Sequence, residues 1–346
     1  MTFRSRQWLS ENVFSPRLGI YLLMATPLLS WTPLFFGYAA AKTFWIFTVV
    51  ELTLVAYLWF IFWRPSLRPK WNWQMGVLIT YVFILVLSTL LSVYPSNSFW
   101  GGYERNEGLL MWLHLAGLFP VFLSFFKTKM SWVSLAMVTC CVGLTVCFIY
   151  FLIRLSFFHP TISDNSGSTL GNSSYLGVYL LFQIFFAWFV VLYGSLQWTR
   201  VLGAMAFVGF VLTLVLTDAR AAIMVFFGGS ILYAALVLFF SQGTRRTMKR
   251  IVGGVLLASL FFGFMFTAIS TLQRDSVVRQ VIVEHATGSR FVVGDIAWKT
   301  FLERPWFGWG LENFPFAFLD GYDPCFGNIY CGGNTLFAHA HNIVLD

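Results

Sequence analysis

The chain has 346 residues, of which 58% are hydrophobic and only 10% are charged. A soluble domain carries about a quarter charged residues, so this composition excludes an ordinary soluble protein and predicts an all-α polytopic transmembrane bundle. The formal net charge of +8 does not indicate a nucleic-acid partner, because the basic residues of such proteins collect in cytoplasmic loops.

Nine segments are apolar over about the 20 residues that a spanning helix needs. They are 18–37, 43–63, 74–93, 109–126, 131–153, 174–194, 201–217, 221–241 and 251–272. The first segment lacks a small-residue cleavage site before the next run, so we expect it to be kept as a helix, kinked at Pro27 and Pro33.

Charge asymmetry orients these segments in the membrane. With the N-terminus in the cytoplasm, every inner loop is basic, and the inner side contains a single acid, Glu11. Because lysine and arginine favour cytoplasmic loops, this arrangement is the expected one. It predicts a membrane bundle over 1–272 and a large periplasmic loop over 273–340, followed by the start of a further transmembrane helix at 341–346.

Two ionisable residues of the apolar segments receive no firm role. Glu51 could lie inside the membrane, where a carboxyl group is costly and often functional, or it could be a boundary residue. His114 lacks companions in the sequence.

The shorter outer loops contain polar clusters. Glu104 and Arg105 lie in the loop before the fourth segment, and Asn172 and Tyr175 open the sixth. Such residues are usually polar connections or helix caps, but they could also line a sugar-binding cavity.

Arg220 lies at the outer end of a helix, beside Asp218. It is either a boundary arginine that extends to the lipid headgroups and pairs with Asp218, or a phosphate ligand at the membrane surface.

The long loop contains a predicted amphipathic helix at 289–304. Trp298, Phe301 and Leu302 share its apolar face with Phe291 and Pro305, and a polar stripe repeats every four residues at Asp295, Lys299 and Glu303. We expect this helix to lie on the membrane surface with its tryptophan inward.

Two further features of the long loop leave alternatives open. Arg290 starts the predicted helix and either binds an anion at the helix N-terminus or lies among the headgroups. Cys325 and Cys331 form a disulfide if the loop is extracytoplasmic, or remain free thiols.

The C-terminal residues resemble the first turn of another helix, so we expect the chain to be a fragment of a longer protein. His341, followed by Asn342, could accept a proton near pH 7 or be an ordinary interfacial histidine. His339 and His341 lack a third ligand, so no metal site is predicted. The sequence contains no nucleotide-binding motif, and no cofactor is expected.

Taken in order, several motifs resemble the O-antigen ligase family of bacterial polytopic glycosyltransferases. The similarity spans the chain from about residue 100 to its end and rests on residues 103–108, 170–180, 216–221, 288–314 and 340–346.

The resemblance implies a fold of the GT-C type and transfer of a glycan from undecaprenyl diphosphate to an acceptor hydroxyl, without a metal. It implies that Arg220 and Arg290 bind the diphosphate and that His341 activates the acceptor. The expected partners are the lipid-linked donor, membrane lipids and an acceptor, which is lipid A-core in the leading hypothesis. The expected location is the bacterial inner membrane, with the active face in the periplasm.

Other functions remain open from the sequence. The acceptor could be a protein such as pilin, or the enzyme could be an O-antigen polymerase. A transporter of bicarbonate or another solute is a hypothesis from a different class, although no internal repeat supports it. A purely structural membrane protein would not need arginines and a histidine on one outer face.

Overall fold

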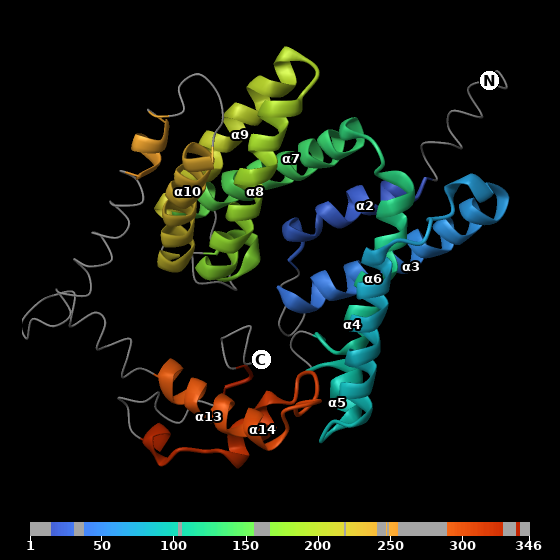
Figure 1. The fold of residues 1–346 in the computed structure, drawn as a ribbon, viewed down its shortest axis with the longest axis vertical. Helices are drawn as coiled ribbons and strands as arrows, with labels where there is room; N and C mark the ends of the chain where they lie inside the picture. Colours follow the sequence, from blue (N-terminus) through green and yellow to red (C-terminus); the bar gives the residue numbers. More distant parts are fainter. Residues whose placement is uncertain are drawn as a thin grey trace, which may run out of the picture. The chain divides into compact units, whose positions relative to one another are not determined.

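Figure 1 shows the computed structural model of the chain. The structure describes residues 15–30, 38–102, 106–155, 167–217, 219–240, 247, 249–254, 289–327 and 337–339. Over these residues every regular element is an α-helix or a 3-10 helix, which confirms the prediction of an all-α fold.

Six helices in the described ranges are long and apolar enough to cross a membrane, so the chain is a multi-pass membrane protein. They are α3 (Ala39–Trp63), α4 (Trp73–Leu90), α7 (Lys129–Arg154), α8 (Ser173–Tyr193), α9 (Gln197–Leu216) and α10 (Arg220–Phe240). Another apolar helix, α6 (Leu109–Phe125), is shorter than these six. All seven correspond to predicted segments, whereas most of the ninth segment lies outside the described residues.

The first predicted segment differs from a kinked spanning helix. The helix α2 (Pro16–Met24) ends before Pro27, and a 3-10 turn, η1 (Thr26–Leu28), follows it. Pro27 has no N–H to donate to the carbonyl of Leu23. The hydroxyl of Thr26 instead donates to this carbonyl, at 2.6 Å.

The chain forms two compact units. The first contains 1–83 and 102–223, and the second contains 84–101 and 224–346. In the first unit α7, α8 and α9 pack against one another, and α2 packs against α3 and α7. Glycines permit the close approach of these helices: a Cβ on Gly203 of α9 would lie 2.9 Å from Cγ1 of Val190 in α8.

The second unit contains the short helices α5 (Pro95–Trp100) and α14 (Phe314–Asp320), together with α13 (Ser289–Glu303). The helix α13 occurs where it was predicted, and the predicted stripe holds an ion pair of 2.6 Å between Asp295 and Lys299. This hydrogen bond raises the pKa of the Lys299 ammonium.

The buried face of α13 differs from the predicted apolar face. The core of the second unit is formed by Val293, Ile296 and Ala297, which pack with Phe318 and Phe326. The predicted face remains exposed, with Trp298 52% and Leu302 58% accessible. The helix therefore has two apolar faces, because α14 covers one of them and leaves the aromatic one free.

The packing of α7 against α9 gives a first prediction. A Cβ on Gly143 would lie 2.8 Å from Cζ of Phe210, a ring that is fully buried and cannot move aside. We expect Gly143→Ala to lower the stability of the detergent-solubilised protein by about 1–3 kcal/mol, as overpacked cores do. Thermal unfolding checks this.

The matched control is Gly229→Ala, which adds the same methyl group to α10 where nothing lies within 4 Å. It should leave the unfolding temperature unchanged or slightly higher, because alanine favours helix more than glycine does. Equal unfolding temperatures for the two variants would contradict the α7–α9 packing described above.

Candidate functional site at the helix starts

Three helices begin at one end of the first unit. They are α3, α8 and α10: the start of α3 contacts the turn before α8, and the start of α10 contacts α8. We call this region the helix-start cluster and define it as residues 38–42, 167–177 and 219–222. It contains parts of two of the motifs on which the sequence analysis depends, namely the one with Asn172 and Tyr175 and the one with Arg220.

Lys42 is the basic residue of this cluster whose side-chain contacts the structure describes. Its Nζ donates to the carbonyl oxygens of Tyr38 and Thr169, both at 2.9 Å. It also lies 5.6 Å from the centre of the Tyr38 ring. Among the described residues no carboxylate forms an ion pair with Lys42. The half-buried ammonium uses two of its three N–H groups for these carbonyl oxygens and has one further N–H to offer.

Sequence reasoning missed Lys42. The available signal was a lysine in the first turn of an otherwise apolar spanning segment, a position where a charge is costly unless it has a partner or a function. The hydroxyl of Thr169, the residue whose carbonyl binds Lys42, is buried and has no hydrogen-bond partner within the described part of the chain. Buried polar atoms without a partner are rare, so a polar group near Lys42 would find an open hydrogen-bonding position.

The turn before α8 is shaped by a glycine and an asparagine. Gly171 has a φ of +81°, and a Cβ there would lie 3.0 Å from Cγ of the Tyr38 ring. Asn172 is the N-cap of α8, since its Oδ1 accepts from the N–H of Ser174 at 2.7 Å. The structure thus gives Asn172 the helix-cap role, and Tyr175 lies exposed on the first turn of α8.

A close contact fixes the start of α10 beside α8. A Cβ on Gly177 would lie 2.6 Å from Cβ of Ala219 and 2.8 Å from Cβ of Ala222. The end of α9 is held as well, because the hydroxyl of Tyr150 donates to the carbonyl of Leu216 at 2.7 Å. These contacts place the backbone of Arg220, the first residue of α10, next to the first turns of α8.

The arrangement favours an anion. Each helix start exposes backbone N–H groups and carries about half a unit of positive charge. The starts of α3 and α8 adjoin Lys42, and the backbone of Arg220 begins α10 beside α8 in the same cluster. Within the described residues of either unit taken by itself, no three His, Cys, Asp or Glu side chains lie close enough to hold a metal ion.

The other predicted site residues lie elsewhere. Arg290 is the second residue of α13 in the second unit, so the structure describes it apart from Arg220. The residues Glu104, Arg105, His341 and Asn342 lie outside the described residues, as does Cys331 of the predicted disulfide.

A loop of the second unit is fastened to the end of α4. The hydroxyl of Ser88 donates to the carbonyl of Phe307 at 2.8 Å, and the N–H of Val93 donates to the carbonyl of Trp309 at 3.2 Å. We call residues 304–313 the fastened loop. Because Ser88 belongs to the last turn of a spanning helix, these bonds fix the depth of the loop at the membrane boundary.

Asn313 closes the fastened loop against α5. Its side chain is fully buried, and its Nδ2 donates to the hydroxyl of Ser98 at 2.9 Å. Its Oδ1 accepts from Nδ2 of Asn97 at 3.0 Å. Gly310 is required where the loop touches α5, since its φ is +100° and a Cβ would lie 2.6 Å from Oγ of Ser98. The motif 308–313 therefore attaches the loop to α5 and to the residues that precede it.

Aromatic side chains surround this attachment. Trp306 is 88% exposed, and the aromatic face of α13 continues from it through Trp298 and Phe301. Arg304 lies 4.9 Å from the centre of the Trp309 ring. Tryptophan and arginine are common at the level of the lipid headgroups, so this surface agrees with the prediction of a helix at the membrane interface.

Comparison with known proteins gives one match, which covers the C-terminal part of the chain. Residues 205–346, which include α10, α13 and α14, match the family model described as O-antigen ligase. No curated protein and no solved structure matches the chain.

The fastened loop gives a second prediction. Both Gly308 and Gly310 have positive φ. A Cβ on Gly310 would clash with Oγ of Ser98 at 2.6 Å, whereas the atom nearest to a Cβ on Gly308 is 4.0 Å away. Gly308→Ala should cost about 1–3 kcal/mol of backbone strain alone. Gly310→Ala should cost clearly more and speed hydrogen exchange throughout the fastened loop and α5. Similar exchange in the two variants would contradict the attachment described here.

Proposed function

We propose that the chain, whose residues 205–346 match the family model described as O-antigen ligase, is a member of that family and transfers a glycan from undecaprenyl diphosphate to an acceptor hydroxyl at the periplasmic face of the bacterial inner membrane. The family consists of ligases and polymerases of lipid-linked glycans. The proposed acceptor is lipid A-core. A protein acceptor such as pilin, or a growing O-antigen chain, would use the same donor site.

The helix-start cluster is the observation that carries this proposal. A lipid diphosphate is a doubly charged group at the membrane boundary, and it needs cations and N–H donors that are already in place. The cluster offers Lys42, which two carbonyl bonds hold half-buried and which has no carboxylate partner among the described residues, and the first N–H groups of three helices. Fixed donors of this kind stabilise developing charge more than mobile water does.

We assign Arg220 to the donor diphosphate because it opens α10 in this cluster. A guanidinium binds phosphate oxygens with a planar fork of N–H groups and stays charged at every working pH. The resemblance to the family gives Arg290, at the start of α13, the same role. Both arginines belong to the first turn of a helix, where the N-terminus itself favours an anion.

The proposed reaction is a displacement at the anomeric carbon. The acceptor O–H gives its proton to the imidazole of His341, and the acceptor oxygen forms a bond to the anomeric carbon. The bond from that carbon to the diphosphate oxygen breaks, and the arginines neutralise the charge that the leaving group acquires. Attack opposite the leaving group inverts the anomeric configuration, and the cations supply the stabilisation without a metal.

The second unit supports access to such a donor. The fastened loop holds the aromatic surface of Trp298, Phe301 and Trp306 at the depth of the last turn of α4. A polyprenyl carrier has its diphosphate at the same depth, because its chain lies in the hydrocarbon. We propose that this surface keeps the loop of α13 at the level of the donor diphosphate.

The site assignment gives a third prediction. Arg220→Ala, Arg290→Ala and His341→Ala should each lower glycan transfer by about 100-fold or more, the usual loss when one preorganised electrostatic or acid–base contact is removed. Transfer is measured with the full chain in vesicles that contain the lipid-linked donor. Lys70→Ala removes an exposed cation from the loop between α3 and α4 and should leave transfer unchanged. Full activity in all three variants would overturn the site.

Lys42 gives a fourth prediction. Lys42→Met keeps the length of the side chain and removes its charge, so transfer should fall by about 10-fold or more while the protein still inserts into the membrane. Lys42→Arg restores the charge and should recover part of the activity. If Lys42→Met transfers glycan at the normal rate, Lys42 has no part in binding the donor.

The acceptor is tested separately. A strain without this protein should lose the long bands of the lipopolysaccharide ladder while its glycoproteins keep their masses. The reverse result would indicate a protein acceptor.

A further inference from the structure

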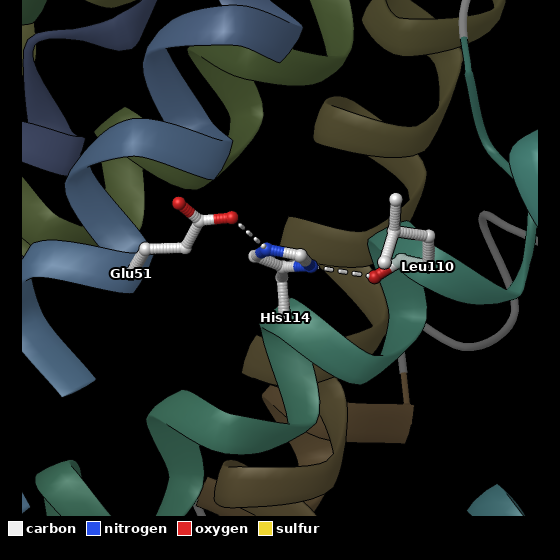
Figure 2. Close-up of polar contacts among 3 residues, drawn as sticks. All are labelled: Glu51, Leu110 and His114. Atoms are coloured by element: carbon white, nitrogen blue, oxygen red, sulfur yellow. Dashed lines mark hydrogen bonds and ion pairs between the residues drawn. The ribbon is translucent and has the colours of Figure 1, made fainter. Parts of the chain in front are cut away.

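Glu51 and His114 form a polar contact between the apolar helices α3 and α6. Figure 2 shows the carboxyl group of Glu51 on α3 directed at the imidazole of His114 on α6. Oε1 of Glu51 lies 3.3 Å from Nε2, and Nδ1 on the other side of the ring lies 2.7 Å from the carbonyl of Leu110. Within the six spanning helices Glu51 is the only acidic residue.

The position of Glu51 places this contact in the hydrocarbon region. Glu51 is at the midpoint of the 25-residue helix α3, about 18 Å along the helix axis from either end. The hydrocarbon core is about 30 Å thick, so the midpoint of α3 lies within it. The Glu51 side chain is 66% exposed and that of His114 12%, so the carboxyl group lies on the outer surface of the bundle. Of the two interpretations open from the sequence, the structure supports the residue inside the membrane.

The carbonyl of Leu110 determines the tautomer of His114. A carbonyl oxygen can only accept a hydrogen bond, so Nδ1 must carry a hydrogen. The contact between Nε2 and Oε1 then requires one more hydrogen, because two bare lone pairs would repel. That hydrogen is either on Glu51, with a neutral ring, or on His114, with an ionised carboxyl group. Both forms contain the same number of protons and have no net charge.

Burial in lipid favours the neutral form. Removing two charges from water costs several kcal/mol per ion unless further hydrogen bonds satisfy them. Among the described residues only His114 is hydrogen-bonded to the Glu51 carboxyl group. The ring of Phe47, one turn earlier on α3, packs on the imidazole with centroids 4.5 Å apart and offers no donor.

Several other ionisable groups of the neighbouring helices contact described residues other than Glu51. Arg17 of α2 donates to the carbonyl of Phe125, and the hydroxyl of Tyr21 pairs with Ser134. On α3 itself, Lys42 donates to two carbonyl groups, and the hydroxyl of Tyr57 is hydrogen-bonded to that of Ser124. The ring of Tyr81 on α4 packs on Trp112. None of these groups neutralises an ionised Glu51.

We propose that Glu51 and His114 form a proton-binding site inside the membrane, in which the carboxylic acid of Glu51 holds the proton and donates it to Nε2 of His114. The site binds a single exchangeable proton. Loss of this proton leaves an unpaired carboxylate in lipid and breaks the hydrogen bond between Glu51 and His114. The proposal does not depend on glycan transfer.

A lipid-soluble carbodiimide tests the state of Glu51. The acid O–H adds across one C=N bond of the reagent, so that the oxygen bonds to carbon and the proton moves to nitrogen. Dicyclohexylcarbodiimide should label the peptide that contains Glu51 at neutral pH when the full chain is in phosphatidylglycerol vesicles. Glu51→Gln should abolish this label, and Glu107→Gln, which changes an exposed acid outside the spans, should not. An unlabelled Glu51 in the wild type would overturn the proposal.

Selective ¹⁵N labelling of histidine tests the other partner. The resonances of His114, assigned from their loss in His114→Phe, should report a neutral ring with a protonated Nδ1 and a hydrogen-bonded, unprotonated Nε2. Glu51→Gln keeps an N–H donor toward Nε2, so it should fold normally and leave the tautomer unchanged. An imidazolium at neutral pH, or a ring protonated on Nε2 alone, would refute the assignment.

Discussion

The contact between Gly177 and the pair Ala219 and Ala222 is the constraint on which the helix-start cluster depends. Without a side chain at 177, the first turns of α8 and α10 come close enough for Arg220 to begin its helix beside the Asn172 cap. The hydrogen bonds of Lys42 then join α3 to the same place. The hydrophobic effect does not drive helices together in lipid, because the lipid tails are as apolar as the side chains. Close packing at small residues and hydrogen bonds between helices stabilise the association instead.

The second unit is organised by the same physical rule with different residues. A backbone that leaves the regular helix near the membrane must still satisfy its N–H and C=O groups. The fastened loop does so through Ser88, Val93 and Asn97, and it buries Asn313 completely. Residues 308–313, which contribute to the resemblance to the family, thus serve to attach the loop. The proposed chemistry is assigned to Arg290 before them and to His341 after them.

The sequence predicted the helices well, because lipid requires long apolar segments that are visible in the composition. It also predicted α13 and its Asp295–Lys299 pair from four-residue spacing. It did not predict which face of α13 is buried, because Val293 and Trp298 are both apolar and only the position of α14 distinguishes them. Lys42 and the pairing of Glu51 with His114 were missed for a related reason: the partners are backbone carbonyls or residues of a distant helix.

The hydrogen bond from Ser88 to Phe307 also links the aromatic loop to the thickness of the bilayer. A spanning helix answers a thicker or thinner membrane by tilting or by shifting along its axis. Because the fastened loop is bonded to the last turn of α4, it has to move with that helix and cannot adjust its depth independently. A change in the lipid composition that alters the thickness of the bilayer therefore also changes the depth of the surface that contains Trp306.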